Sequence, residues 1–158
     1  MRIPLTYSLI LLLFGNSATL LGCRDQNELA PRLGDPLDCA PSHDTMFAIS
    51  PAQFVKGCSI SKSGVKYFVG SIDGKTIDFV STQDSNFRTP EGVRLGSSIR
   101  EVILAGGTQI YEEPSWAYLS RLPSGWSAKF GGAPGMEIRG TASLKCDSVV
   151  HELFLRRY

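Results

Sequence analysis

The sequence predicts an α+β fold, in which a small, twisted and mainly antiparallel sheet carries one short packed helix. Two observations support this prediction: short runs of β-branched and aromatic residues recur from about residue 64 onward, and a single later stretch has helical periodicity. Of the 158 residues, 42% are hydrophobic and 9% aromatic, which is typical of a globular chain. The expected organisation is a signal peptide over 1–22, a tether over 23–44 and one domain over 45–158.

The first two strand candidates are residues 65–69 and 76–80. Asp73-Gly74 lies between them and is a strong signal for a two-residue hairpin turn, whose central positions both need a positive φ. Before them, Ser50-Pro51 favours the start of a short helix that ends at Gly57. The further strand candidates, separated by segments rich in glycine and proline, are 92–95, 109–112, 116–122, 126–130, 136–144 and 148–154.

One helix is expected over residues 98–105. Ser98 and Glu101 have the spacing of a capping box, in which each side chain binds the other residue's backbone N–H. Ile99, Val102 and Ile103 form a stripe at helical spacing that should pack on the sheet. Gly106 follows as the residue that ends the helix in a left-handed conformation.

The N-terminus has the three parts of a secretory signal peptide. Arg2 is followed by an apolar stretch over residues 3–14 and then by small and polar residues over 15–19. The apolar stretch is shorter than the roughly 20 residues that a permanent membrane-spanning helix needs. We therefore expect cleavage and export.

The signal ends in Leu20-Leu21-Gly22-Cys23, which resembles the lipobox of bacterial lipoproteins. The resemblance implies that Cys23 receives a diacylglyceryl group, that cleavage precedes it, and that acyl chains then anchor the chain to a membrane. Several chains together hold firmly, because each buried CH₂ contributes about 0.8 kcal/mol. The alternative is cleavage by the general signal peptidase near Ala18 or Gly22, which would release a soluble periplasmic or secreted protein.

Residue 24 is arginine and not aspartate. By resemblance to the same lipoproteins, this favours the outer membrane of a Gram-negative bacterium, with the domain facing the periplasm. The tether that follows is punctuated by Pro31, Pro36 and Pro41 and has no apolar periodicity, as is typical of a linker.

Three cysteines remain if Cys23 is lipidated: Cys39, Cys58 and Cys146. Disulfides are allowed in an exported protein. The preferred pair is Cys39–Cys58, because it would link the N-terminal segment to the domain. A Cys58–Cys146 pair remains open, since sequence alone does not fix connectivity.

Charge and motif content argue against several functional classes. Removal of Arg2 with the signal leaves 15 basic and 15 acidic residues, so a nucleic-acid partner is not expected. The cysteines and histidines lack the spacing of a zinc site, and no glycine pattern fits a nucleotide cofactor. We therefore predict no metal and no cofactor.

Residues that could perform catalysis are scattered. His43 lies in the tether, and His151 should point to the opposite face of its strand from Glu152 and from Cys146. Glu112 and Glu113 are adjacent in one strand, so their side chains should diverge and remain solvated. These patterns predict a protein that is not an enzyme, with no catalytic residue assigned.

Tyr111, Trp116, Tyr118 and Trp126 are the concentrated aromatic residues. Trp116 and Tyr118 should share one face of a strand at a period of two. Facing outward with Arg121 nearby, Trp116, Tyr118 and Trp126 could bind a protein or a glycan. Facing inward, they would form core.

Residues 89–107 combine a Gly-aliphatic-x-aliphatic-Gly-x-Ser pattern with the capped helix and a final glycine. This element resembles one in outer-membrane assembly lipoproteins of the small-protein-A type and in β-lactamase-inhibitor-like modules. The resemblance implies a small α+β domain that binds other proteins and catalyses nothing. In this sequence the element lies mid-chain, and no binding residue is transferred.

Together these observations predict a membrane-anchored binding module whose partner is an envelope protein or the cell wall. Two alternatives remain. One is an assembly factor of the outer membrane, in which a sheet edge adds a strand to a client. The other is a periplasmic hydrolase.

Overall fold

The structure is a computed structural model that describes residues 30–39, 46–131 and 148–157. These residues form a sheet-rich fold with one helix of six residues, α1 (Ile99–Leu104). The strands are β1 (Met46–Ser50), β2 (Gln53–Lys62), β3 (Val65–Ser71), β4 (Phe79–Thr82), β5 (Tyr111–Glu113), β6 (Ala117–Arg121), β7 (Ser127–Phe130) and β8 (Val150–Arg156).

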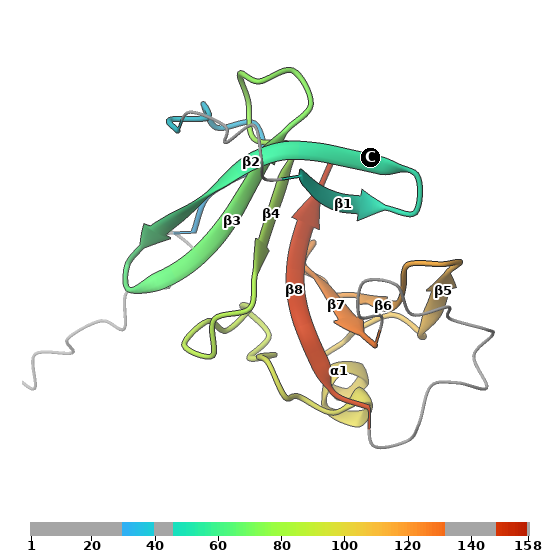
Figure 1. The fold of residues 1–158 in the computed structure, drawn as a ribbon. Coiled ribbons are helices and arrows are strands. Elements are labelled where there is room, and N and C mark those ends of the chain that lie inside the picture. Colours follow the sequence, from blue (N-terminus) through green and yellow to red (C-terminus); the bar gives the residue numbers. More distant parts are fainter. Residues whose placement is uncertain (1–29, 40–45, 132–147, 158) are drawn as a thin grey trace, which may run out of the picture.

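The strands form a single curled sheet in the order β1-β2-β3-β4-β8-β7-β6-β5 (Figure 1). Every neighbouring pair is antiparallel. Strands β1 to β4 form one meander and β5 to β7 a second, and β8 joins the two halves. Among the described strands, β1 and β5 are therefore the two edges.

The expected mainly antiparallel sheet with one packed helix is thus present. The label α+β fits less well, because the described residues contain one short helix beside a sheet that runs through the whole domain. Residues 92–95 and 105–110 form loops on either side of α1. The described segment between β4 and β5 therefore contributes six helical residues and no further helix.

Each face of the sheet carries a hydrophobic core. On β8, Leu153 points into one core and Phe154 into the other, as strand alternation requires. The first core includes Val102 of α1, and we call it the helix-side core. The second includes Ile49 of β1 and Trp116, and we call it the groove-side core.

Strand β2 replaces the short helix expected at residues 50–57, so that prediction is wrong. Pro51 and Ala52 instead form the turn between β1 and β2. Val55 is buried in the groove-side core, and the chain continues as strand to Lys62. The alternating burial along β2 follows a period of two, so sheet pairing overrides the local helix-start signal.

A glycine pair lets β2 and β3 pack closely. Gly57 and Gly70 are opposite each other in the ladder. A methyl group on Gly57 would overlap the carbonyl oxygen of Val69 and the ring of Phe68, and one on Gly70 would overlap Val55. The aromatic ring therefore occupies the space that a side chain at position 57 would need.

The two-residue hairpin turn lies at a different place in the chain from the one expected. The two-residue hairpin turn is Ser63-Gly64, where both residues have a positive φ, of 54° and 78°. Asp73-Gly74, expected to form such a turn, lies in a longer connection between β3 and β4. The carboxylate of Asp73 organises that connection by accepting hydrogen bonds from the backbone N–H groups of Lys75 (2.8 Å) and Thr76 (3.1 Å).

The predicted helix and its capping box are confirmed. The Ser98 hydroxyl accepts from the Glu101 backbone, and the Glu101 carboxylate accepts from the Ser98 backbone. Val102 is fully buried, while Ile103 at the edge of the apolar stripe is 42% exposed. Residues 92–95, expected as a strand, form a loop, and residues 136–144 lie outside the described part of the chain.

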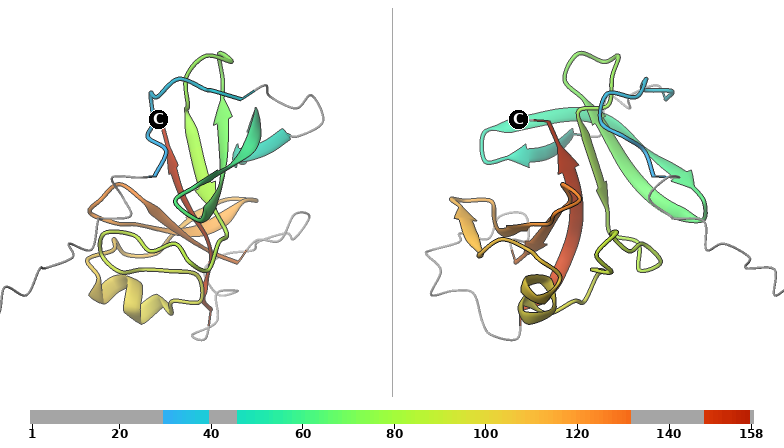
Figure 2. Two further views of the ribbon diagram at one scale, coloured as in Figure 1. Left: turned by 90° about the vertical axis from the view of Figure 1, so that its left-hand side faces the viewer. Right: turned by 180° about the vertical axis from the view of Figure 1, so that it is seen from behind.

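Residues 30–39 pack on the domain, which corrects the predicted extent of the tether. Ala30 is buried in the helix-side core, with Leu33 and Leu37 packed against it. Three backbone hydrogen bonds join this segment to residues 75–77. Figure 2 shows the segment lying along the body of the domain. The apolar residues that hold the segment there are irregularly spaced, so the sequence shows neither a helical nor a strand period that would have predicted the packing.

The preferred disulfide, Cys39–Cys58, is present, with the two Cα atoms 6.6 Å apart. It links the end of the 30–39 segment to β2. Cys23 and Cys146 lie outside the described residues, as do the signal peptide and His43.

Substituting Gly57→Ala should destabilise the domain by about 1–3 kcal/mol, because the added methyl group has no space between β2, β3 and Phe68. Urea denaturation measures the loss. Ser59→Ala, at an exposed position of the same strand, is the control and should change stability by less than about 0.5 kcal/mol. Equal stability of the two variants would contradict the close packing described.

Hydrogen bonds from the Lys75 and Thr76 backbone and from the Ser71 hydroxyl lower the pKa of Asp73 from 3.8 to about 2. A carboxylate with a lowered folded-state pKa stabilises the fold above its ordinary pKa, and this contribution is lost as the pH falls from about 4 to about 2. An NMR titration of Asp73 should give the low midpoint, and the Lys75 and Thr76 amides should lose protection from exchange, relative to their intrinsic rates, below it. In Asp73→Asn the protection of these amides should show no such step over that pH range.

Candidate functional site

Arg156 connects three strands on the groove side of the sheet. Its guanidinium donates to the carbonyl oxygen of Ile49 on β1 (2.7 Å) and makes a two-pronged ion pair with the carboxylate of Glu113 on β5. Strands β1 and β5 are the two edges of the described sheet. One side chain of the central strand β8 therefore holds both edges.

Two cations lie near the ring of Trp116. It is in the turn after β5, where Ser115 adopts a left-handed φ of 61°. The Arg156 guanidinium is 5.1 Å from the ring centroid, and the Lys129 ammonium is 4.7 Å from it. Both distances are within the range of a cation–π interaction. The ring also makes an edge contact with Phe154, at 5.4 Å between centroids.

A second ion pair completes this cluster. Lys129 on β7 binds Glu152 on β8 at 3.0 Å. Side-chain exposure is 7% for Arg156, 19% for Glu113, 13% for Lys129 and 15% for Glu152. Charges so far removed from water are costly unless they are paired. Each of the two ion pairs therefore keeps its cation beside the indole of Trp116. We call these four residues and Trp116 the charged cluster.

An open groove of about 380 Å³ lies beside the charged cluster. Ile49 and Ser50 of β1, Gln53 of β2, Ile72 after β3, Glu113 of β5, and Arg156 and Arg157 at the end of the chain line it. The groove therefore occupies the gap between the two sheet edges that Arg156 bridges.

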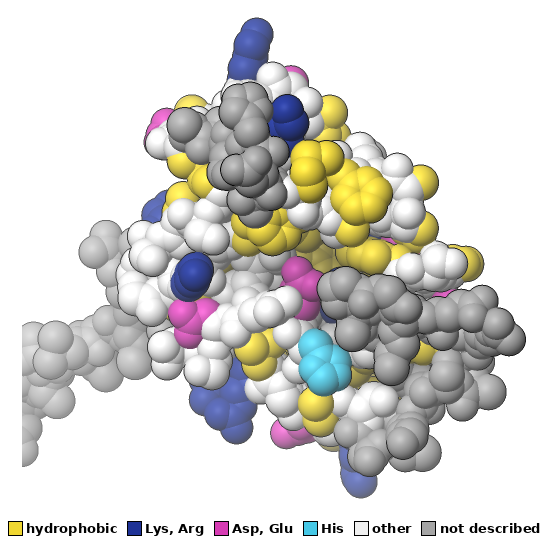
Figure 3. Space-filling model, in the orientation of Figure 1, with side chains coloured by type: hydrophobic (Ala, Val, Ile, Leu, Met, Phe, Trp, Pro, Cys, Tyr) yellow, Lys and Arg dark blue, Asp and Glu magenta, His cyan; other side chains and the backbone are white. Residues whose placement is uncertain are grey.

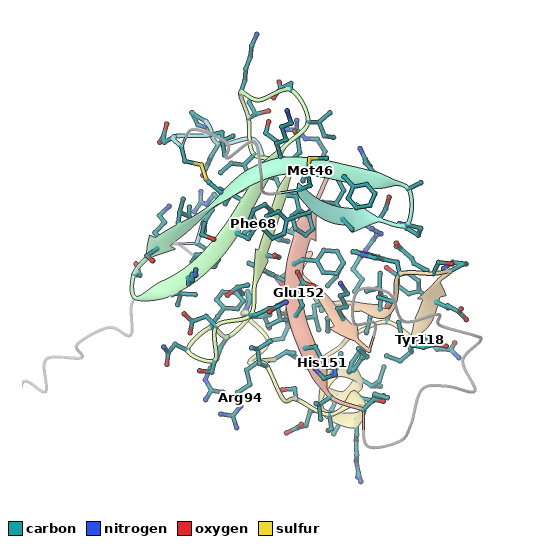
Figure 4. All side chains as sticks on the ribbon, viewed as in Figure 1. Met46, Phe68, Arg94, Tyr118, His151 and Glu152 are labelled. Carbon is teal, nitrogen blue, oxygen red and sulfur yellow. A yellow bond between two sulfur atoms is a disulfide. The ribbon has the colours of Figure 1, made fainter. Side chains whose placement is uncertain are left out.

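Three apolar side chains of this half of the sheet are exposed, and one of them, Ile72, lines the groove. Met46, Phe54 and Ile72 are 53%, 58% and 61% exposed, and we call them the apolar rim. Phe54 is opposite Ala48 in the ladder, which places it diagonally from Met46 on the same face of the β1–β2 ribbon. Figure 3 shows hydrophobic side chains gathered over this ribbon, and Figure 4 labels Met46 there.

The aromatic residues predicted as a possible partner surface are buried. Trp116 is 9% exposed, Tyr118 2% and Trp126 3%, so the inward alternative describes them. Tyr118 and Trp126 belong to the helix-side core and Trp116 to the groove-side core. Trp116 and Tyr118 thus do not share a face, because Trp116 precedes the first residue of β6. Arg121 is exposed at the far end of β6.

The expected solvated position of Glu113 is also corrected, because its carboxylate is mostly buried against Arg156. His151 is exposed on β8, and the neighbouring Glu152 binds Lys129 instead. The described residues bring together no group of three His, Cys, Asp or Glu side chains that could hold a metal ion.

Sequence analysis missed Arg156, Lys129 and the pairing role of Glu152. One signal was present: Glu152, Phe154 and Arg156 occupy alternate positions of the last strand and so share a face. Their ion partners lie on β5 and β7, and sequence gives no means of finding those strands as neighbours of β8.

No protein-family model matches the chain, and no curated protein matches it. Among solved structures, the chain is similar to one described as the uncharacterized protein yfeY from Escherichia coli. The two are 20% identical with a TM-score of 0.44, and the likeness covers 72% of this chain and 79% of that chain. Within the described residues, no helix has the length and apolar character to cross a membrane.

Arg156→Met should destabilise the domain by about 3 kcal/mol, because it leaves the Glu113 carboxylate buried without its cation. Arg157→Met is the matched control, since the neighbouring side chain is 58% exposed and should cost less than about 1 kcal/mol. The double variant Arg156→Met, Glu113→Met should recover most of the loss. Urea denaturation of all three variants measures this, and equal losses at positions 156 and 157 would contradict the bridging role.

Proposed function

We propose that the chain is a membrane-anchored periplasmic lipoprotein whose domain is a non-enzymatic binding module for an envelope protein. The anchor is the lipidated Cys23. The contact surface is the apolar rim, and not the aromatic residues considered from sequence. The observation that carries the binding function is the exposure of the apolar side chains Met46, Phe54 and Ile72 on the surface of the domain.

The Cys39–Cys58 disulfide supports export, because disulfides persist in oxidising compartments such as the periplasm.

The chemistry of the rim supports a protein as the partner. Its side chains are aliphatic, thioether and aromatic, and the neighbouring charge on the same face of the ribbon is Lys56, opposite Met46. Exposed apolar side chains such as these contribute to protein interfaces by burying apolar area against the partner. Tethering would add to the affinity by raising the effective concentration at the membrane.

Strand addition, the assembly-factor alternative, has less support at β1. The strand is five residues long, its register shifts between Ala48 and Ser50, and the Ile49 carbonyl is engaged by Arg156. Short length and irregular register are common protections of edge strands. We therefore assign recognition to the rim side chains and not to the free backbone of the edge.

Site-specific photo-crosslinking in intact cells tests the contact surface. A photoreactive phenylalanine analogue at position 54 should give a defined protein adduct. The same analogue at exposed Lys62, on the far end of the same strand, should not. Met46→Ser should weaken the adduct from position 54 by at least about fivefold, corresponding to roughly 1 kcal/mol of lost apolar contact.

Metabolic labelling with a fatty-acid probe tests the anchor in the same cells. The wild-type chain should be labelled, and Cys23→Ser should be neither labelled nor membrane-bound. A wild-type chain without label would refute the lipoprotein assignment. Equal adducts at positions 54 and 62, or none at either, would refute the assignment of the rim.

A further inference from the structure

The folded domain begins much closer to the anchor than the sequence suggests. Ala30 is 5% exposed and lies in the helix-side core. From there to Cys39 the chain is held by hydrogen bonds of Gly34 to Ile77 (2.8 Å) and Leu37 to Lys75 (2.9 Å), and by the disulfide. These residues cannot extend without unfolding part of the domain.

The covalent chain between Cys23 and Ala30 limits how far the domain can move. The two residues are 30 − 23 = 7 positions apart. A chain spans at most about 3.6 Å per residue, so the two Cα atoms cannot be more than about 25 Å apart in any conformation. This limit rests on covalent geometry alone.

The point of attachment and the groove are on opposite faces of the sheet. Ala30, Leu33 and Leu37 pack on the helix-side core, whereas Ile49 and Trp116 beside the groove belong to the groove-side core. In Figure 2, the right-hand view from behind shows the 30–39 segment in front of the sheet, on the side away from the viewer of Figure 1. The anchor therefore draws the helix-side face toward the lipid.

We infer that the domain is held at the membrane surface with its helix-side face toward the bilayer and its groove toward the aqueous compartment. This inference rests on the proposed lipid anchor at Cys23. It narrows the partner to a protein that presents its contact surface beside the same membrane. A short tether favours such a partner, because effective concentration falls steeply as a linker lengthens.

Fluorescence energy transfer to labelled lipid headgroups tests this orientation. The lipidated protein is reconstituted into vesicles of phosphatidylethanolamine and phosphatidylglycerol. A donor dye is attached through an azide-bearing amino acid, which leaves the cysteines unmodified. The dye replaces either Arg32, exposed in the 30–39 segment, or Gln53, which lines the groove. Transfer from position 32 should exceed transfer from position 53.

A length variant is the control. A flexible Gly/Ser spacer of about 20 residues between positions 29 and 30 adds about 25 Å of root-mean-square reach. It should lower transfer from position 32 and remove the difference between the two positions. Thermal unfolding of each labelled protein verifies that the fold is retained.

The possible failures are distinguishable. Protein that does not float with vesicles and carries no lipid refutes the anchor, and the orientation with it. Protein that floats but transfers energy equally from both positions, or more strongly from position 53, refutes the orientation alone. Unchanged transfer in the spacer variant would show that the domain adheres to lipid by itself and is not positioned by the short tether.

Discussion

The two-pronged ion pair of Arg156, with its third bond to the Ile49 carbonyl, is the interaction on which the shape of the domain depends. A sheet in which the two edge strands of the described residues are not paired to each other can open or close, and here one guanidinium fixes the separation of those edges. Breaking this ion pair would be costly, because both charges are mostly buried and an unpaired one could not return to water while the domain stays folded. The groove has its width for the same reason.

The rest of the architecture makes that position of Arg156 possible. Gly57 and Gly70 face each other in the ladder and Phe68 covers the space beside them, so β2 and β3 pack closely. On the groove side, the ring of Trp116 lies near both Arg156 and Lys129. Apolar packing on both faces of the sheet supplies the main stabilisation, and the charged cluster links β1, β5, β7 and β8 on the groove side.

Local features of the fold could be predicted from sequence, and non-local ones could not. The capping box at Ser98 and Glu101 is a contact between residues three apart, and it was found with its helix. The strands around residues 65–69, 117–121 and 127–130 were found by composition. The helix predicted at residues 50–57 was wrong because pairing with β3 decides that segment. The charged cluster was missed because Glu113, Lys129 and Arg156 come from three strands, and their adjacency follows from topology.

The position of β8 has a consequence for the way the chain folds. The last strand in sequence is the middle strand of the sheet and pairs with both β4 and β7. Neither meander can be joined to the other until this strand arrives. The pairing of β4 with β8 therefore joins residues far apart in the sequence, unlike the pairing within each meander, and completion must wait for the C-terminal residues. A nascent chain that lacks its final segment stays open and unfinished. If the chain is exported as we propose, this dependence on the last strand would delay folding until synthesis is complete.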